Sequence, residues 1–223
     1  WCLARRVLTG GAAVLAAGVF LLHPVQTESV AYVAARSELL ITTALLLALL
    51  CVERGWWLAA FGLSAAAIIG KQTGVLALAL VPLWATWRRL PTWTPIVRLY
   101  WGGGGLSGLP VASLEHMAVT MTAWTRLLAL WVVPWGQTID HDWALIGTGG
   151  MGAALLVWAV PGAWWALSRR LSWVPFVAVW SAVLVFPRVI WQVPDGVHEH
   201  HLYSASVVLS LATGRSFQEA VWQ

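Results

Sequence analysis

The residues of this sequence that could do chemistry gather in a few short polar segments. The first spans residues 23 to 38, where Glu28, Tyr32 and Arg36 recur every four residues. Pro24 favours the start of a helix here, because the N–H that proline lacks would have no helical partner in the first turn anyway. Residues four apart on a helix share a face. This face either lines a binding site or belongs to a short interfacial helix in which Arg36 neutralises a nearby acid. The candidate site residues of this segment are His23, Gln26, Glu28, Tyr32 and Arg36.

Two later segments combine acidic side chains with imidazoles. At 140 to 142 a histidine lies between two aspartates, which could ligate a divalent cation or could form a solvated turn. At 198 to 201 three histidines and a glutamate follow one another, without the spacing that places two histidines on one helix face. We therefore assign no metal ligands, and a divalent cation is the only cofactor that these segments suggest. Their candidate site residues are Asp140, His141, Asp142, Glu199, His200, His201 and Tyr203.

Two basic residues could contact an anionic substrate. Arg126 lies in a predicted apolar helix, eight residues before Pro134, which is roughly 12 Å along a straight helix. An unpaired guanidinium at that depth in lipid would be costly, so the sequence predicts that Arg126 faces the interior of the bundle. There it could hold a lipid-linked phosphate or a substrate carboxylate, or it could pair with a buried acid. Lys71 could contact a phosphate as a point charge or lie among lipid headgroups.

The composition predicts the elements that must position these residues. Hydrophobic residues make up 60% of the 223 and charged residues 10%, against about 25% charged in soluble domains. This balance predicts an all-α fold, a polytopic transmembrane helix bundle of about eight helices that forms one membrane domain over residues 1 to 223. We expect an integral membrane protein of the bacterial inner membrane or, in a eukaryote, of the endoplasmic reticulum. The predicted helices cover 7 to 22, 39 to 53, 56 to 70, 72 to 87, 112 to 135, 148 to 168, 171 to 187 and 202 to 214.

The distribution of basic residues predicts which helix ends lie together. If each predicted helix crosses the membrane, nine basic residues fall on one side and three on the other, with Arg126 inside a helix. The net charge of +4 therefore marks the sides of the membrane, and we expect no nucleic-acid partner. The polar segments then share the opposite side, where 23 to 38, 136 to 147 and 188 to 203 should converge. The nine basic residues predicted to share one side are Arg5, Arg6, Arg54, Arg88, Arg89, Arg98, Arg169, Arg170 and Arg215.

Four segments, in the same order, resemble the sequence elements of one family. The most specific begins at His23, reads HPVQTESVAY and continues to RSELL at 36 to 40. The others read GKQTGV…P at 70 to 82, RLL…PWG…DHD at 126 to 142 and P…PD…EHHLY at 187 to 203. Together they are similar to the transmembrane, tetratricopeptide-repeat-containing O-mannosyltransferases and their bacterial relatives. Gln72, His201 and Ala205 stand where that family usually has Glu, Arg and Pro.

The resemblance implies an enzyme, a membrane glycosyltransferase of superfamily C that takes a sugar from a polyprenyl-phosphate donor on the noncytoplasmic face. In that superfamily the catalytic acid lies in the first outer loop. A chain that opens at Trp1 would lack this loop and the helix before it, so the catalytic residues stay unassigned. The partners expected from the resemblance are membrane lipids, the polyprenyl-phosphate sugar, a protein acceptor and neighbouring membrane subunits.

Two other functions fit the same sequence. A noncatalytic membrane subunit of a larger complex could bind lipid, pigment or partner helices through the 18 tryptophans of this Trp-rich chain. Copurification with such a complex would distinguish this alternative from an enzyme. A transporter is the other alternative, which is disfavoured because no pair of broken helices and no inverted repeat is evident in the sequence.

Overall fold

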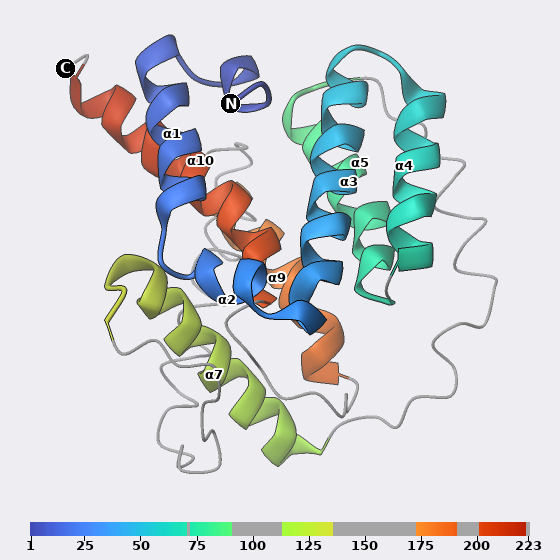
Figure 1. The fold of residues 1–223 in the computed structure, drawn as a ribbon, viewed down its shortest axis with the longest axis vertical. Coiled ribbons are helices and arrows are strands. Elements are labelled where there is room, and N and C mark those ends of the chain that lie inside the picture. The colour runs from blue at the N-terminus through green and yellow to red at the C-terminus, as the bar shows by residue number, and fades with distance from the viewer. Residues whose placement is uncertain (71, 91–112, 136–172, 191–200, 222–223) are drawn as a thin grey trace.

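The computed structural model describes residues 1 to 70, 72 to 90, 113 to 135, 173 to 190 and 201 to 221, and every regular element among them is a helix (Figure 1). The all-α class is therefore confirmed for this part of the chain. The α-helices are α1 (Gly10–Leu22), α2 (Gln26–Ala31), α3 (Arg36–Glu53), α4 (Trp57–Gly70), α5 (Ala77–Trp87), α7 (Leu114–Val132), α9 (Trp173–Ile190) and α10 (Leu202–Val221). Short 3-10 helices are η1 (Ala4–Arg6), η2 (Val33–Ala35) and η3 (Gln72–Leu76).

The helices fall where the apolar runs predicted them, but the transmembrane prediction is wrong. Among the described residues, no helix combines the length and the apolar character that crossing a bilayer requires. The apolar helices α1, α4 and α5 have 13, 14 and 11 residues, about 16 to 21 Å at 1.5 Å per residue, against a hydrocarbon core of about 30 Å. This finding corrects the transmembrane bundle and the integral-membrane localisation expected above. The predicted helix at 148 to 168 lies outside the described residues.

Close backbone packing joins the first and last helices. Gly214 of α10 lies against α1, where a Cβ at this position would be 2.6 Å from the Ala12 carbonyl oxygen and 2.9 Å from the Ala16 Cβ. Ala12, Ala13 and Ala16 are all buried. Small residues on both helices thus let α1 and α10 approach each other more closely than larger side chains would allow.

Aromatic side chains fill the space between α5 and α9. The Trp84 ring is almost fully buried and packs edge-on against Trp87, Phe176 and Trp180, with ring centroids 5.3, 6.0 and 6.5 Å apart. Such edge-to-face pairs place the positive ring edge against the negative ring face, which adds to the gain from burial. Trp84 and Trp180 are therefore core residues, although they belong to the 18 tryptophans considered above as a surface for lipid, pigment or partner helices.

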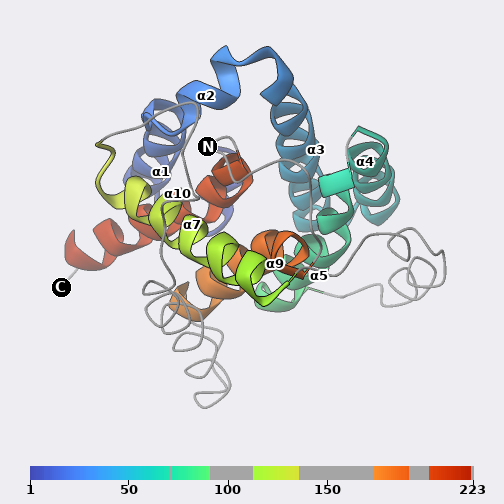
Figure 2. The same cartoon turned by 90° about the horizontal axis from the view of Figure 1, so that it is seen from below.

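The two ends of the bundle carry different residues. Figure 1 shows η1, the turn between α3 and α4 and the end of α5 at one end, and α2, the start of α3 and the end of α4 at the other. Seen from below in Figure 2, α2 and the α2–α3 connection lie at the margin of the bundle while α7 and α10 cross its middle. Alternating helix directions thus separate the arginines near the first end from the polar segment 23 to 38 at the second.

Candidate functional site

A small cavity at the end of the bundle that carries the polar segments is the candidate site. Its volume is about 30 Å³, which is room for about one water molecule or one hydroxyl group and too little for a sugar ring. Aliphatic side chains form most of the wall, and α3, η3, α5, α7, α9 and α10 all contribute to it. Its polar or partly polar lining residues are Glu38, Thr73, Trp124, His201 and Ser204.

These lining residues come from segments that are far apart in the sequence. Glu38 lies in the first turn of α3 and is 4% exposed, and His201 directly precedes α10 and is also buried. Thr73 belongs to η3, and Trp124 to the middle of α7. Glu38, Thr73 and His201 each fall within a segment that resembles the glycosyltransferase family, and Trp124 lies two residues before the segment that starts at Arg126.

Buried hydrogen bonds hold α10 against α2 and α3 beside this cavity. The Oγ atoms of Thr42 on α3 and Ser204 on α10 are 2.7 Å apart. Gln26 of α2 donates from Nε2 to the Ser206 Oγ over 2.7 Å, and Ser206 in turn donates to the Tyr203 carbonyl. Buried polar groups need such partners, so these bonds fix how the helices meet. These bonds and the shared cavity place the described part of 23 to 38 beside His201 and Tyr203. The segment 136 to 147 and residues 191 to 200 lie outside the described residues, so the convergence of all three segments stays a prediction.

Polar atoms on η3 and on α7 beside the cavity are buried without a hydrogen-bond partner among the described residues. They are the Thr73 Oγ1 and the Trp124 Nε1, both of which are buried. Trp124 can only donate, whereas a threonine hydroxyl can donate and accept. An unpaired buried group costs about 1 to 3 kcal/mol. A water molecule or a ligand hydroxyl that reaches these atoms would remove that cost.

His23 has a structural role. Its Nδ1 accepts a hydrogen bond from the Val25 N–H over 3.2 Å, and its Nε2 lies 2.8 Å from the Trp131 carbonyl oxygen. The two bonds together require a neutral imidazole with the proton on Nε2. The imidazole also stacks on the Trp131 indole, with ring centroids 4.0 Å apart. Because both nitrogens are used, His23 ties the start of the polar segment to α7.

Other predicted site residues lie away from the cavity. Tyr32 and Arg36 are exposed. Arg126 is also exposed, so the prediction that it faces the interior is wrong: Trp124 and Leu127 occupy the buried face of α7. Tyr203 packs edge-on against Phe20, with ring centroids 5.4 Å apart. Burial raises the pKa of the Tyr203 phenol above its ordinary value of 10.0.

The remaining predicted site residues lie partly or wholly outside the part of the chain that the structure describes. Glu28 lies on α2, but its side chain falls outside what the structure describes. Outside the described ranges altogether are Lys71, Asp140, His141, Asp142, Glu199 and His200. Within those ranges, no three His, Cys, Asp or Glu side chains gather as a metal site would require.

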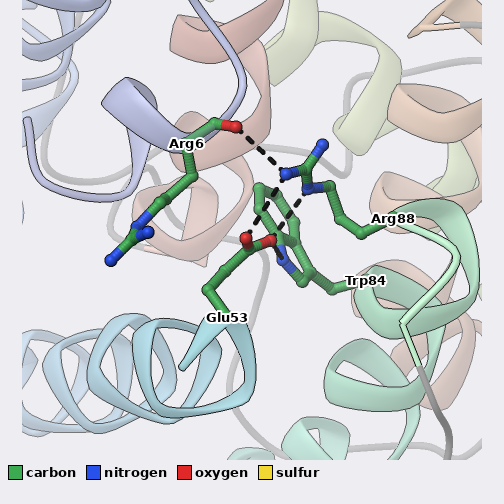
Figure 3. Close-up of polar contacts among 4 residues, drawn as sticks. All are labelled: Arg6, Glu53, Trp84 and Arg88. Carbon is green, nitrogen blue, oxygen red and sulfur yellow. Dashed lines mark hydrogen bonds and ion pairs between the residues drawn. The ribbon is translucent and has the colours of Figure 1, made fainter. Parts of the chain in front are cut away.

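Sequence reasoning missed a polar cluster at the other end of the bundle (Figure 3). Glu53, the last residue of α3, accepts hydrogen bonds from Arg88 Nε and Trp84 Nε1 over 2.8 and 2.9 Å. Arg88 also donates from Nη2 to the Arg6 carbonyl oxygen over 3.0 Å. Glu53 and its neighbouring arginine read as an ordinary tight turn in the sequence. The feature of the sequence that could have revealed the cluster is an acid at the end of one apolar run and an arginine at the end of another.

A scan against protein-family models, a search of curated proteins and a search of solved structures each returned no match for this chain. The resemblance to the O-mannosyltransferases therefore rests on the motif residues themselves.

Proposed function

We propose that this chain acts in the transfer of a sugar from a polyprenyl-phosphate donor to an acceptor, and that the cavity receives one polar group of the sugar. The observation that supports this function is the meeting of Glu38, Thr73 and His201 around one cavity. Each belongs to a different segment of the family resemblance, and the segments are separated by many residues in the sequence. Residues that serve one ligand need such proximity, whereas unrelated polar residues do not.

The chemistry of the lining residues suits a sugar hydroxyl. The carboxyl group of Glu38 has two oxygens with several lone pairs, so it can accept a hydrogen bond from a hydroxyl in addition to its other contacts. The Thr73 Oγ1 and the Trp124 Nε1 can supply a further acceptor and donor. Because the cavity is only about 30 Å³, the sugar ring itself has to remain outside while one hydroxyl or hydroxymethyl group enters.

The test is the binding of polyprenyl-phosphate mannose, followed by quenching of tryptophan fluorescence in detergent micelles, with polyprenyl phosphate as the sugar-free reference. We expect the mannose-bearing lipid to bind more tightly than the reference. Glu38→Gln should weaken its binding by about tenfold, because one charged hydrogen bond is worth about 1.5 kcal/mol or more. Glu219→Gln is the matched control, since Glu219 is exposed near the end of α10.

Two results would contradict the proposal. One is equal binding of the lipid with and without its sugar. The other is an equal effect of the Glu38 and Glu219 substitutions, because the cavity would then have no part in recognising the sugar. Release of labelled mannose to an acceptor or to water, measured on the same preparations, distinguishes transfer from binding alone.

A further inference from the structure

Four exposed arginines, Arg5, Arg6, Arg54 and Arg89, form what we call the arginine end of the bundle. The bond from Arg88 Nη2 to the Arg6 carbonyl oxygen brings η1 beside the end of α5. Arg54 follows Glu53 and Arg89 follows Arg88 in the sequence, so both flank the same ion pair. In Figure 3 the Arg6 guanidinium points away from that pair. Each of the four arginines is therefore a member of this hydrogen-bonded cluster or follows or precedes a member of it in the sequence.

The charge of the arginine end is not balanced by the residues that the structure describes. The Glu53 carboxylate already accepts hydrogen bonds from Arg88, at 2.8 and 3.3 Å, and from the Trp84 N–H. No described carboxylate pairs with any of the four exposed guanidinium groups. Like charges held near one another repel, and an anionic partner removes this repulsion.

Two of these arginines stack on exposed indole rings. Arg5 lies over Trp1 and Arg54 over Trp56, with the guanidinium carbon 5.8 and 5.4 Å from the ring centroid. Trp1 is 63% exposed and Trp56 58% exposed. Leu58, the second residue of α4, is 85% exposed. Indole rings and long arginine side chains have an apolar body and a polar tip, a combination that suits the boundary between lipid headgroups and acyl chains.

The backbone conformation of Arg89 also indicates that positive charge is favoured at the arginine end. Arg89 has φ 55°, a left-handed conformation that favours glycine. Gly55 occupies the corresponding position after α3, with φ 74°. Both residues end a helix with the same pair of hydrogen bonds, from Gly55 to Val52 and Trp56 to Cys51, and from Arg89 to Thr86 and Leu90 to Ala85. An arginine thus takes a position where glycine would be less strained, and it adds a positive charge there.

We propose that the arginine end docks on a lipid surface that carries anionic phosphate headgroups. This contact is made from outside the lipid, so it requires no helix to cross a bilayer. It also differs from the sugar site, because Arg54 and Glu38 lie at opposite ends of α3, a helix of 18 residues that is about 27 Å long. A single-stranded nucleic acid also presents phosphates to arginines and bases to exposed rings. However, Leu58 gives the surface an apolar contact that suits acyl chains better.

The experiment is cosedimentation of the full chain with sucrose-loaded vesicles of phosphatidylcholine, with and without phosphatidylserine. We expect binding only to the anionic vesicles, and weaker binding as salt is added. The double variant Arg54→Gln/Arg89→Gln should bind about 30-fold more weakly, since each arginine near an anionic surface contributes about fivefold. The matched control is Arg36→Gln/Arg126→Gln, which removes two exposed arginines away from this end and should bind like the unaltered chain.

Three results would overturn the inference. Equal binding to neutral and anionic vesicles would remove the role of charge. An equal loss in the two double variants would show that net charge, rather than the arginine end, decides binding. Displacement of the chain from anionic vesicles by a single-stranded oligonucleotide at the same phosphate concentration would assign the surface to nucleic acid. Unaltered helical circular dichroism in both variants checks that each is folded.

Discussion

Glu53 and Arg88 join the ends of α3 and α5 through two hydrogen bonds, from Arg88 Nε to Oε1 at 2.8 Å and from Nη2 to Oε2 at 3.3 Å. The same carboxylate accepts the Trp84 N–H, and the same guanidinium reaches the Arg6 carbonyl. This ion pair thus connects three segments of the chain that lie far apart in sequence. A cluster of this kind specifies geometry, because each member loses its partners if one segment shifts.

Arg88→Gln should therefore destabilise the fold. The substitution leaves the Glu53 carboxylate in place with only the Trp84 N–H as a described partner, and we expect a loss of about 1.5 to 3 kcal/mol in the free energy of unfolding. Chemical denaturation followed by circular dichroism measures this loss. Arg215→Gln is the control, since Arg215 forms an exposed ion pair with Glu219 four residues away, and such a pair contributes only about 0.3 to 0.5 kcal/mol. Equal losses would mean that the cluster adds no more stability than an exposed ion pair does.

Gly214→Ala should also be destabilising. The new Cβ would approach the Ala12 carbonyl oxygen to 2.6 Å and the Leu8 Cδ1 to 2.9 Å. Since the first contact is with backbone, α1 and α10 would have to separate, at a cost of about 1 to 3 kcal/mol. Gly18→Ala on α1 is the matched control, because nothing lies within 4 Å of its Cβ. The control should be neutral or stabilising by up to about 1 kcal/mol. A neutral Gly214→Ala would show that the two helices are not closely packed.

The sequence predicted where helices form and which helix ends lie together. Apolar runs bounded by charges mark the helices, and helices joined by short connections alternate in direction whether or not they cross a membrane. The polar segment 23 to 38 and the arginines near Glu53 therefore separate to opposite ends, although the transmembrane premise was wrong.

The sequence could not predict which charged residues face inward. Arg126 was expected inside and is exposed, whereas Glu38 was not among the candidate site residues and is buried. The burial of such a residue depends on the neighbouring helices, and local spacing carries no information about them. His23 illustrates the same limit, because its partner Trp131 is 108 residues away.

Arg89→Gly should stabilise the fold while weakening vesicle binding. Glycine adopts the positive φ of 55° at this position without the steric conflict of a Cβ, which is worth about 1 kcal/mol. Thermal unfolding measures the gain, and the reverse comparison is Gly55→Ala, which should lose a similar amount after α3. Lower stability of Arg89→Gly would mean that the arginine side chain holds the end of α5 through contacts of its own.

The stability of the fold should fall at high pH because of Tyr203. Burial raises the pKa of its phenol above 10.0 in the folded chain. The folded state therefore holds the phenolic proton more tightly than the unfolded state does. The resulting stabilisation is fully present below pH 10 and is lost as pH rises through the higher pKa of the folded chain.

Tyr203→Phe keeps the ring against Phe20 and removes the ionisable group. Urea denaturation of both chains across this pH range should show the unaltered chain losing stability relative to Tyr203→Phe above about pH 10, with a constant difference below it. A difference that stays constant throughout would show that Tyr203 ionises equally easily in the folded and unfolded states.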